Sequence, residues 1–534
     1  SHLDSGWTQL ACNLDKWTLS EKEFRTYKNT YGIGIAFHVK NNGVGKAWWD
    51  KIELEEIKET APAVTIQPNS LFSTFTDMKT QEQLQKTIDS INADKDLDKT
   101  KLEYVLGQHR IEDFENADCV IKNPGVKIQG NKYLACAKAI ESDMSIFLKF
   151  TKAPIIAVTG SKGKSSTVSA INYGLNQAGF TCFLGGNITV SPLTFLDKTS
   201  ENTPVVLELS SWQLADLRGR QLLKPKISII TKIVPDHQNW YGNMEDYVAD
   251  KKLIYKDQTT SDYSIFDDDS DAEGTGPTNG DTWGNQFSTE SNATILRYSA
   301  NHKLQNKFGV WQEKDENGQC IGKVLLPGMK QSETILKELS VPGEHMKINA
   351  LNAALVMYLM KVPAEKIITI LNSWQGIDHR LQYFHCYNTN NSTVKFYNDS
   401  CATVPEACSA ASQAFGKPVI LIAGGTDKGL SFEPLIETLT KDKNAIPVKS
   451  LYLLEGTGTD KFLPALKAAK LDYNGTYPNL KNLLLDLQKE IETVTNDEIV
   501  VFSPGATSFG MFQNEFHRGN TFMETVKEIF QNNN

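Results

Sequence analysis

The sequence predicts an α/β protein of three domains, each built around a parallel sheet. Its 534 residues are too many for one hydrophobic core, so several domains are expected. Three series of short apolar strands alternate with helical stretches, and they begin near residues 102, 155 and 394. This alternation is typical of parallel βα units. The breaks between the series place the domain boundaries near residues 150 and 378.

The first domain, residues 1–150, is predicted to be Rossmann-like. Strands are expected at Leu102–Leu106 and Cys119–Ile121, followed by a helix over Tyr133–Ile140. Another strand ends at Asp77, the place where an acid of a dinucleotide-type fold meets a ribose or a base. The sequence has no glycine between Gly45 and Asp77, so the usual phosphate loop is missing there. Residues 1–90 are therefore interpreted as a divergent part of this domain.

The second domain, residues 151–377, opens on a strand that breaks into a glycine loop and then a helix. Gly160 and Gly163 let the backbone curl around an anion, which the N-terminus of the following helix also favours. Lys164 can reach the β- and γ-phosphates of a nucleotide, and the hydroxyls of Ser165 and Ser166 can reach Mg²⁺. Val158 stands where a standard P-loop has its first glycine, but the context still predicts a parallel sheet of the P-loop ATPase type.

Two more strands of the second domain end in candidate ligands. Val205–Leu209 carries Glu208 near its carboxyl end, and Ile227–Thr231 is followed by His237. Ligands gather at the carboxyl ends of parallel strands. Glu208 offers the hard oxygen that Mg²⁺ prefers, and His237 can hold a second metal or touch a phosphate. Residues 267–292 are rich in Asp, Gly, Thr, Asn and Ser and are expected to form a surface excursion.

The third domain, residues 378–534, is predicted to be Rossmann-like as well. Its strands are expected at Val394–Asn398, Val419–Ala423, Ser450–Leu454 and Ile499–Phe502. Polar residues that include Asp399, Lys428 and Ser508 follow three of these strands, which predicts a pocket for a small anionic ligand. Arg380 lies at the boundary between the second and third domains. Its permanent charge can clamp a triphosphate when the domains close.

Composition excludes several classes of protein. Apolar residues make up 40% and charged residues 22%, as in an ordinary globular protein. The net charge is −9 and no basic tract is present, which argues against bulk binding of nucleic acid. No apolar run reaches the roughly 18 residues of a membrane helix. Eight scattered cysteines without a C-x-x-C pair indicate reduced thiols in a cytoplasmic protein.

Taken in order, these segments resemble the Mur ligases, the ATP-dependent amide-forming enzymes of peptidoglycan assembly. The segments that carry the resemblance are Thr159–Ser165, Gly186-Asn187, Glu208–Leu214, Asp236-His237, Gly343–His345 with Asn349, His379-Arg380, Asn398–Thr403, Gly424–Lys428 and Ser503–Gly519. The sequences Glu-Leu-Ser-Ser-Trp-Gln-Leu and Ser-Pro-x-x-x-Ser, followed by a Phe and an Arg-Gly pair, are similar to the branch of the family that adds D-glutamate.

The resemblance implies a role for each candidate residue. It implies ATP binding by Gly160, Ser161, Lys162, Gly163, Lys164, Ser165, Ser166, Arg380 and Asp399. It implies two Mg²⁺ ions held by Ser165, Ser166, Glu208, His237 and a carbamylated Lys251, and a catalytic set of Lys164, Glu208, His237 and Lys251. It implies substrate contacts from Asp77 and Gly125 to the uridine diphosphate, from Asn187 to the muramoyl part, and from Thr403, Lys428 and Ser508 to D-glutamate.

The activity that follows from the resemblance is addition of D-glutamate to UDP-N-acetylmuramoyl-L-alanine through an acyl phosphate, by a cytoplasmic monomer. The chain departs from the family pattern at Cys401, where a lysine is common, at Gly510, where Asp is frequent, and at Glu515, where an aromatic usually stands. These departures leave open another Mur or folylpolyglutamate-type ligase, a plain ATPase or kinase, and a nucleotide-binding scaffold without ligation.

Overall fold

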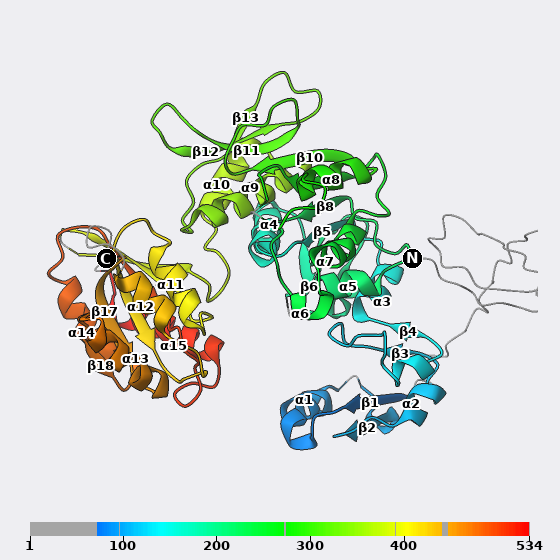
Figure 1. The fold of residues 1–534 in the computed structure, drawn as a ribbon, viewed down its shortest axis with the longest axis horizontal. Helices are drawn as coiled ribbons and strands as arrows, with labels where there is room; N and C mark the ends of the chain where they lie inside the picture. The colour runs from blue at the N-terminus through cyan, green and yellow to red at the C-terminus, as the bar shows by residue number, and fades with distance from the viewer. Residues whose placement is uncertain are drawn as a thin grey trace, which may run out of the picture. The chain divides into compact units, whose positions relative to one another are not determined.

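The computed structural model describes residues 72–95, 97–188, 190–271, 274–389, 391–440 and 447–532 (Figure 1). Most of the predicted divergent segment 1–90 therefore lies outside the described residues. The chain separates into two compact units. The first takes in the described residues up to Ser142 together with Leu217–Gln221, and the second takes in the rest. Among the described residues, no helix combines the length and the apolar character needed to cross a membrane.

The first unit holds two small parallel sheets, each of two strands. Its elements are β1 (Ser73–Asp77), α1 (Gln81–Ala93), η2 (Lys99–Lys101), β2 (Leu102–Leu106), α2 (Ile111–Asn116), β3 (Val120–Ile121), η3 (Leu134–Cys136) and β4 (Ile140–Glu141). Strand β1 pairs with β2, and β3 pairs with β4. Arg220 joins this unit because its guanidinium binds Oε2 of Glu141 at 2.8 Å and the carbonyl of Ile140.

The helix expected over Tyr133–Ile140 is wrong. The structure has one 3₁₀ turn there, η3, and then strand β4. The side chain of Asn131 accepts hydrogen bonds from the N–H groups of Tyr133 and Leu134, which starts the turn. Ile140 then pairs with Val120, because β3 has a free edge that a parallel strand completes. Tertiary pairing overrides the local helical pattern here.

Residues 143–377 build a mixed sheet of nine strands with the order β13-β12-β11-β10-β9-β8-β5-β7-β6. The elements are α3 (Asp143–Phe150), β5 (Ile155–Thr159), α4 (Lys164–Ala178), β6 (Phe183–Gly186), η4 (Pro192–Lys198), β7 (Val205–Glu208), α5 (Ser211–Asp216), β8 (Ile227–Ile230), α6 (Gln238–Tyr241), α7 (Met244–Lys251), η5 (Lys252–Ile254), β9 (Tyr263–Asp267), α8 (Trp283–Glu290), β10 (Thr294–Ser299), β11 (Gly309–Lys314), β12 (Cys320–Leu325), β13 (Glu333–Leu336), α9 (Glu344–Leu359) and α10 (Ala364–Asn372).

The strand order of this sheet predicts where a ligand would bind. Strands β6 to β11 run parallel, and β5 lies between β7 and β8. The chain leaves β5 for one side of the sheet and later returns to its other side, so a crevice opens at the carboxyl end of β5. The strand predictions for Val205–Leu209 and Ile227–Thr231 agree with β7 and β8. The expected surface excursion 267–292 contains α8, which Thr282 caps by accepting a hydrogen bond from the N–H of Asn285.

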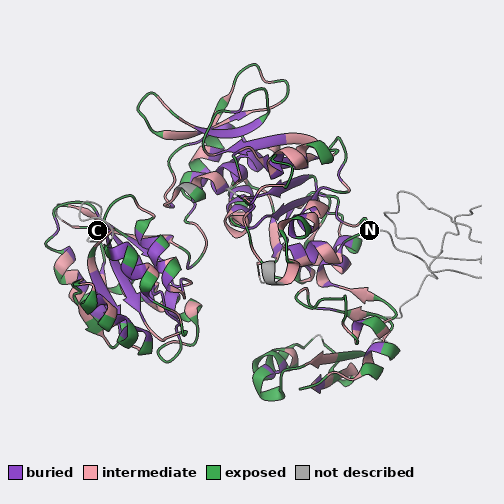
Figure 2. Cartoon of the chain, in the orientation of Figure 1, coloured by how far each residue is buried: buried purple, intermediate pink, exposed green. Residues whose placement is uncertain are grey.

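One face of this sheet is covered by α4 and α9. Helix α4 contributes Val168, Ile171 and Leu175 to the core. Every residue of α9 from Ala350 to Met357 is buried, and all of them except Asn352 are apolar. A helix that is apolar all round belongs inside a core. Gly174 allows the two helices to approach, because a Cβ there would crowd the side chain of Met357. Figure 2 shows this buried interior in purple.

Residues 378–532 build a sheet of six strands with the order β14-β15-β19-β16-β17-β18, in which all but β14 are parallel. The elements are β14 (Gln382–Asn388), β15 (Thr393–Asn398), α11 (Pro405–Gln413), β16 (Val419–Gly424), α12 (Glu433–Thr440), β17 (Val448–Leu454), α13 (Thr457–Ala468), β18 (Gly475–Tyr477), α14 (Leu480–Ile491), β19 (Glu498–Phe502) and α15 (Glu515–Ile529).

Helices cover both faces of this second sheet, as its sequence requires. Ile420 and Ile422 join a core with α14 and α15, whereas their neighbours Val419 and Leu421 join a separate core with α11, α12 and α13. Successive side chains of a strand point to opposite faces, so a strand apolar at every position must be buried on both. The predicted α/β class and parallel sheets are confirmed. The division into three domains at residues 150 and 377, with a Rossmann-like first domain, stays a prediction.

Candidate active site

The loop between β5 and α4 curls tightly around the carboxyl end of β5. Gly160 has a φ of 142°, and a Cβ on it would overlap the hydroxyl of Thr231. Gly163 has a φ of 93° and precedes α4 directly, with Asn349 of α9 packed against it. Only glycine fits these two positions. The N–H groups of Ser161 and Lys162 both donate to the carbonyl of Lys232, so the donors left for an anion are those of the first turn of α4.

Two lysine side chains converge on one carbonyl oxygen of this loop. The amine nitrogens of Lys164 and Lys251 each lie 2.9 Å from the carbonyl oxygen of Gly160. Burial lowers the pKa of Lys164, and Glu208 and Asp236 oppose that shift. Burial lowers the pKa of Lys251 well below its ordinary value, and the neighbouring charge of Lys164 lowers it further. Lys251 is only 2% exposed, so it is not the surface lysine that its place on a helix would suggest. The repulsion favours a neutral amine on Lys251.

Glu208 enters the site from the end of β7, the strand beside β5. Its Oε1 accepts a hydrogen bond of 3.1 Å from the amide of Asn187, while its Oε2 is buried without a hydrogen-bond partner in the described part of the chain. The N–H of Asn187 also donates to the Glu208 carbonyl. Asn187 therefore orients the carboxylate, a contact that the sequence did not predict. An unpaired buried carboxylate oxygen is costly, which marks it as a position for a cation.

His237 follows β8 and lies on the same edge of the sheet. Its φ of 52° is in the left-handed region, which is uncommon outside glycine. Its ring lies 5.0 Å from that of Trp212, at the start of α5, and 6.3 Å from that of Tyr247 on α7. The Tyr247 ring also lies 4.5 Å from the Lys251 amine, and its hydroxyl contacts Ser161 at 3.0 Å. Aromatic rings thus fix His237 and Lys251 beside the phosphate loop.

Lys232 is a positioning residue that sequence reasoning missed. Its carbonyl holds the phosphate loop, and its amine binds Oδ2 of Asp267 at 3.1 Å and the carbonyl of Ser270 at 3.0 Å. It therefore joins the phosphate loop to the segment after β9. Burial raises the pKa of Asp267 to about 6, and Lys232 opposes the shift. Its only sequence signal is its place just after a strand that borders β5.

The second candidate cluster lies at the carboxyl ends of β15, β19 and β16, three neighbouring strands. Asp399 follows β15, and its Oδ2 accepts a hydrogen bond of 2.6 Å from the hydroxyl of Ser503, which follows β19. Backbone bonds between Thr426 and Thr507 join the segments after β16 and β19. The strand order reverses between β16 and β19, so a crevice is expected at this point. The three predicted strand ends do meet here.

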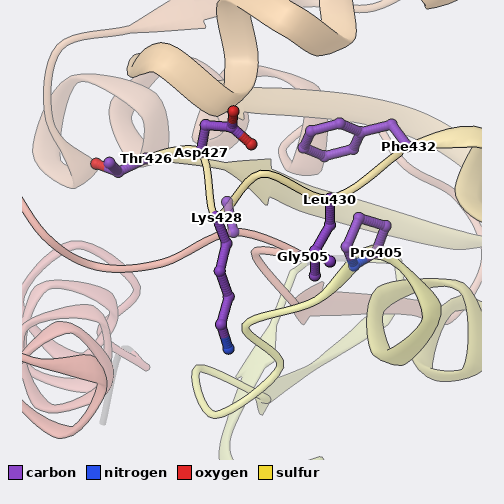
Figure 3. Close-up of a pocket in the computed structure, with 8 residues that line it drawn as sticks. Pro405, Thr426, Asp427, Lys428, Leu430, Phe432 and Gly505 are labelled. Atoms are coloured by element: carbon purple, nitrogen blue, oxygen red, sulfur yellow. The ribbon is translucent and has the colours of Figure 1, made fainter.

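A pocket lies in this crevice, lined by Pro405, Thr426, Asp427, Lys428, Leu430, Phe432, Gly505 and Ala506. Figure 3 shows Lys428 extending from the segment that follows β16. Lys428 is exposed, and its amine lies 3.5 Å from the hydroxyl of Thr403. Ser508 is buried and lies three residues after Gly505, which lines the pocket. An exposed cation beside a hydroxyl group is suited to a carboxylate ligand.

Arg518 of α15 ties this cluster together, and the sequence assigned it no role of its own. Its guanidinium donates to the hydroxyl and the carbonyl of Ser400, at 3.0 and 2.7 Å, and to the carbonyl of Ala506 at 2.9 Å. Arg518 is 1% exposed. Burial lowers its pKa to about 10. Its only signal in the sequence was the Arg-Gly pair at the end of the segment Ser503–Gly519, which resembles the family pattern.

The remaining predicted residues lie at strand ends or in the segment before β14. Arg380 is exposed and lies between β14 and α10. Asp77 ends β1, where its Oδ1 accepts a hydrogen bond of 2.8 Å from the N–H of Lys79. Gly125 follows β3, and its N–H donates to the side chain of Asn123 at 3.0 Å. Asp77 and Gly125 belong to the first compact unit, which is described by itself.

Comparison with known proteins decides the family. Residues 158–357 match the model of the Mur ligase middle domain. The UDP-N-acetylmuramoylalanine–D-glutamate ligase of Treponema pallidum is 37% identical to this chain, over 86% of the chain and 93% of its own length. The protein of the same name from Borreliella burgdorferi is 34% identical, over 85% of the chain and 92% of its own length. The chain belongs to the Mur ligase family.

Solved structures agree with this Mur ligase in fold. The MurF structure from Acinetobacter baumannii has a TM-score of 0.51 and 16% identity, covering 84% of this chain and 99% of its own. A structure of the UDP-N-acetylmuramoylalanyl-D-glutamyl-2,6-diaminopimelate–D-alanyl-D-alanyl ligase of the same organism has a TM-score of 0.50 and 16% identity, covering 77% of this Mur ligase and 89% of its own chain. At this identity the likeness concerns the fold alone.

Proposed function

We propose that this Mur ligase joins D-glutamate to UDP-N-acetylmuramoyl-L-alanine with hydrolysis of ATP to ADP, in peptidoglycan synthesis. The carrying observation is the similarity to ligases of that name over most of both chains, at 37 and 34% identity. The geometry at the end of β5 supplies the chemistry that such a ligase needs. We place the enzyme in the cytoplasm as a monomer.

The reaction begins when the alanyl carboxylate attacks the γ-phosphate of ATP and an acyl phosphate and ADP form. The free N–H groups at the start of α4 and the amine of Lys164 bind the phosphates. Lys164 now binds the carbonyls of Gly160 and Ser161, so it must turn toward the nucleotide when ATP enters. We assign further ATP contacts to Arg380 and Asp399. The amine of D-glutamate then attacks the acyl carbon, and phosphate leaves as the amide forms.

The residues present fit magnesium. The orphaned Oε2 of Glu208 and the hydroxyls of Ser165 and Ser166 are hard oxygen donors, and an unpaired buried carboxylate oxygen suits a divalent cation. Among the described residues, no three His, Cys, Asp or Glu side chains gather as a ready metal site. We assign one ion to Glu208 with the serine hydroxyls and a second to His237 with Lys251. When bound, magnesium supplies neutralisation of the phosphate charge that grows during transfer.

We also propose that Lys251 is carbamylated. A neutral amine attacks carbon dioxide, the nitrogen–carbon bond forms, and the nitrogen releases a proton. The burial of Lys251 and the closeness of Lys164 both favour the neutral amine that this step requires. The product is an anion, so it replaces repulsion toward Lys164 with attraction. The same change gives Lys251 the oxygens that a metal ligand needs.

For the second substrate, we assign Thr403, Lys428 and Ser508 to the carboxylates of D-glutamate. We assign Asn187 to the muramoyl part and Asp77 and Gly125 to the uridine diphosphate. Lys428 and Thr403 already contact each other beside the pocket at the β16–β19 crevice. A carboxylate there would accept from both groups. Cys401, Gly510 and Glu515 depart from the family pattern close to these residues in the sequence. The assay below therefore tests directly which amino acid the enzyme accepts.

A ligation assay with mass-spectrometric identification of the product tests the proposal. UDP-N-acetylmuramoyl-L-alanine, ATP, Mg²⁺ and bicarbonate are supplied with a panel of amino acids, and phosphate release is measured. We expect release only with D-glutamate, and a product heavier by one glutamyl residue. Phosphate release independent of any amine would indicate an ATPase, and release with another amino acid would indicate a different ligase. ATP binding without any product would overturn the proposal.

A further inference from the structure

Arg380 is held by an unusual backbone. The segment Asp378–Gln382, here called the strap, comes after α10 and ends on the first residue of β14. Both neighbours of Arg380 have left-handed backbone angles, with φ of 61° at His379 and 43° at Leu381. Non-glycine residues adopt such angles only when the surroundings impose them. The backbone N–H of Arg380 donates to the carbonyl of Ile377 at 3.1 Å, but its guanidinium makes no hydrogen bond or ion pair with the part of the chain that the structure describes. The guanidinium is therefore positioned through the backbone of the strap and through the neighbours of Arg380.

His379 fixes one side of the strap through its ring. The amide of Asn398 donates to Nδ1 of His379 at 2.8 Å. The orientation of that amide is set because its oxygen accepts from the N–H of Ser400 at 3.1 Å. The His379 ring must therefore be neutral, with its proton on Nε2. Burial lowers the pKa of His379, which agrees with that neutral form.

Gly519 of α15 provides the space for this ring. A Cβ at Gly519 would overlap Nδ1 of His379, so no other residue fits while the ring is in place. The carbonyl of Gly519 also accepts from the amide of Asn398 at 3.3 Å. Glycine in the middle of a helix destabilises it by roughly 0.5–1 kcal/mol relative to alanine. The need to admit His379 is a physical reason for glycine at this helical position.

The other side of the strap is fixed by backbone and carboxylate contacts. The N–H of Leu381 donates to Oδ1 of Asp399 at 3.1 Å, and the N–H of Cys401 donates to the carbonyl of His379 at 3.0 Å. The N–H of His379 donates to the side chain of Gln382 at 3.0 Å. Each residue beside Arg380 is thus bound to the end of β15 or to the strap itself.

We propose that His379 and Gly519 are positioning residues that hold the strap in its left-handed form and so aim Arg380 at ATP. The inference rests on the proposed function, which makes Arg380 a phosphate ligand. It adds two residues that touch no substrate, and it assigns a task to the glycine of the Arg-Gly pair in α15. The strap is then a fixed mount for Arg380 and not a flexible linker.

The main test is a double-variant cycle between Gly519→Ala and Arg380→Ala. Each single variant should lower kcat/KM for ATP by about a hundredfold, the loss that a displacement of about 1 Å produces. The double variant should lose no more than Arg380→Ala alone, because Gly519 acts through Arg380. KM for UDP-N-acetylmuramoyl-L-alanine should stay within about twofold of the unsubstituted enzyme. Additive losses, or wild-type kinetics in Gly519→Ala, would overturn the inference.

Asn520→Ala is the matched control for the helix. Asn520 is exposed and next to Gly519, so this change raises helix propensity without approaching His379. It should leave the ATP kinetics unchanged. Loss of activity in Asn520→Ala equal to that in Gly519→Ala would show that α15 merely tolerates no substitution, and it would overturn the inference.

A second comparison uses His379 itself. In His379→Asn, a side-chain oxygen can replace Nδ1 as the acceptor, and asparagine tolerates positive φ. In His379→Leu, both features are lost. We expect His379→Asn to retain ATP kinetics within about tenfold and His379→Leu to match Gly519→Ala. Equal losses in both variants would contradict the acceptor role. Wild-type kinetics in Arg380→Ala would instead refute the ATP contact of the proposed function.

Discussion

The phosphate site at β5 and the cluster at the β15–β19–β16 ends treat buried charge in opposite ways. In the first, two lysine amines share the Gly160 carbonyl, and one oxygen of Glu208 has no hydrogen-bond partner among the described residues. In the second, Arg518 has three acceptors and both oxygens of Asp399 are bound. We call the first site unbalanced, because its buried charged groups are not fully paired among the described residues and ligands must supply the remaining partners. We call the second cluster balanced, because its charged groups have hydrogen-bond partners, and these bonds hold the loops in place before any ligand arrives.

The largest effect on activity is expected from a substitution that removes a cation from the unbalanced site. Lys164→Met should lower the rate of phosphate release by about a thousandfold, because a donor to transition-state charge is lost. The free energy of unfolding should not fall, because the variant no longer buries an amine. Stopped assays of phosphate release and denaturant unfolding check both results. Near-normal turnover would contradict the role of Lys164, and strong destabilisation would contradict the comparison.

The matching change in the balanced cluster is Arg518→Met. It leaves buried acceptors of Ser400 and Ala506 unpaired, so the free energy of unfolding should fall by about 3 kcal/mol. Denaturant unfolding measures this loss. Arg518→Lys serves as the control and should retain part of the stability because it keeps a buried donor. If Arg518→Met were as stable as the parent protein, the balanced cluster would not depend on its guanidinium.

Asp399 gives the balanced cluster a pH dependence. Burial raises its pKa to about 7 in the folded protein, although Ser503 and the N–H of Leu381 oppose the shift. The folded state then binds more protons than the unfolded state between about pH 4 and 7, so stability falls as pH rises through that range. Between pH 5 and 8 the loss should be on the order of 2 kcal/mol. In Asp399→Asn this component disappears. Parallel pH profiles for both proteins would refute the assignment.

The smallest expected change in stability comes from Lys251→Met. In protein freed of bicarbonate, where Lys251 carries no carbamate, the substitution removes a buried amine and its repulsion toward Lys164, so the free energy of unfolding at neutral pH should rise by about 1 kcal/mol. Ligation should be lost because no carbamate can form. Lys251→Arg is the control, since it places a permanent charge at the same buried position and should be less stable than Lys251→Met. If Lys251→Met were less stable than the parent protein, the buried Lys251 amine would contribute net stability, and this prediction would be wrong.

The sequence predicted the strand ends β5, β7 and β8 well because they follow from local pattern. Glu208, His237 and the glycine loop were singled out from apolar strands followed by polar residues, and the sheet order places these three strands side by side. Their roles as site residues stay predictions. Lys251 was the exception, since its place on a helix indicates a surface lysine until tertiary contacts bury it. The short strand β4 was missed for a related reason, because its pairing partner β3 is distant in sequence.

By itself, the sequence determined the α/β class, the glycine loop at Gly160–Ser166 and the family. These features depend on residue types at fixed spacing along the chain. Only the tertiary structure decided which carbonyl Lys164 and Lys251 share, why Gly519 must lack a side chain, and how Lys232 and Arg518 hold the loops. Those contacts join residues far apart in the chain, and no periodicity or spacing encodes a distance across a fold. The charge of each site follows from those contacts, because burial and neighbours set the pKa of a group.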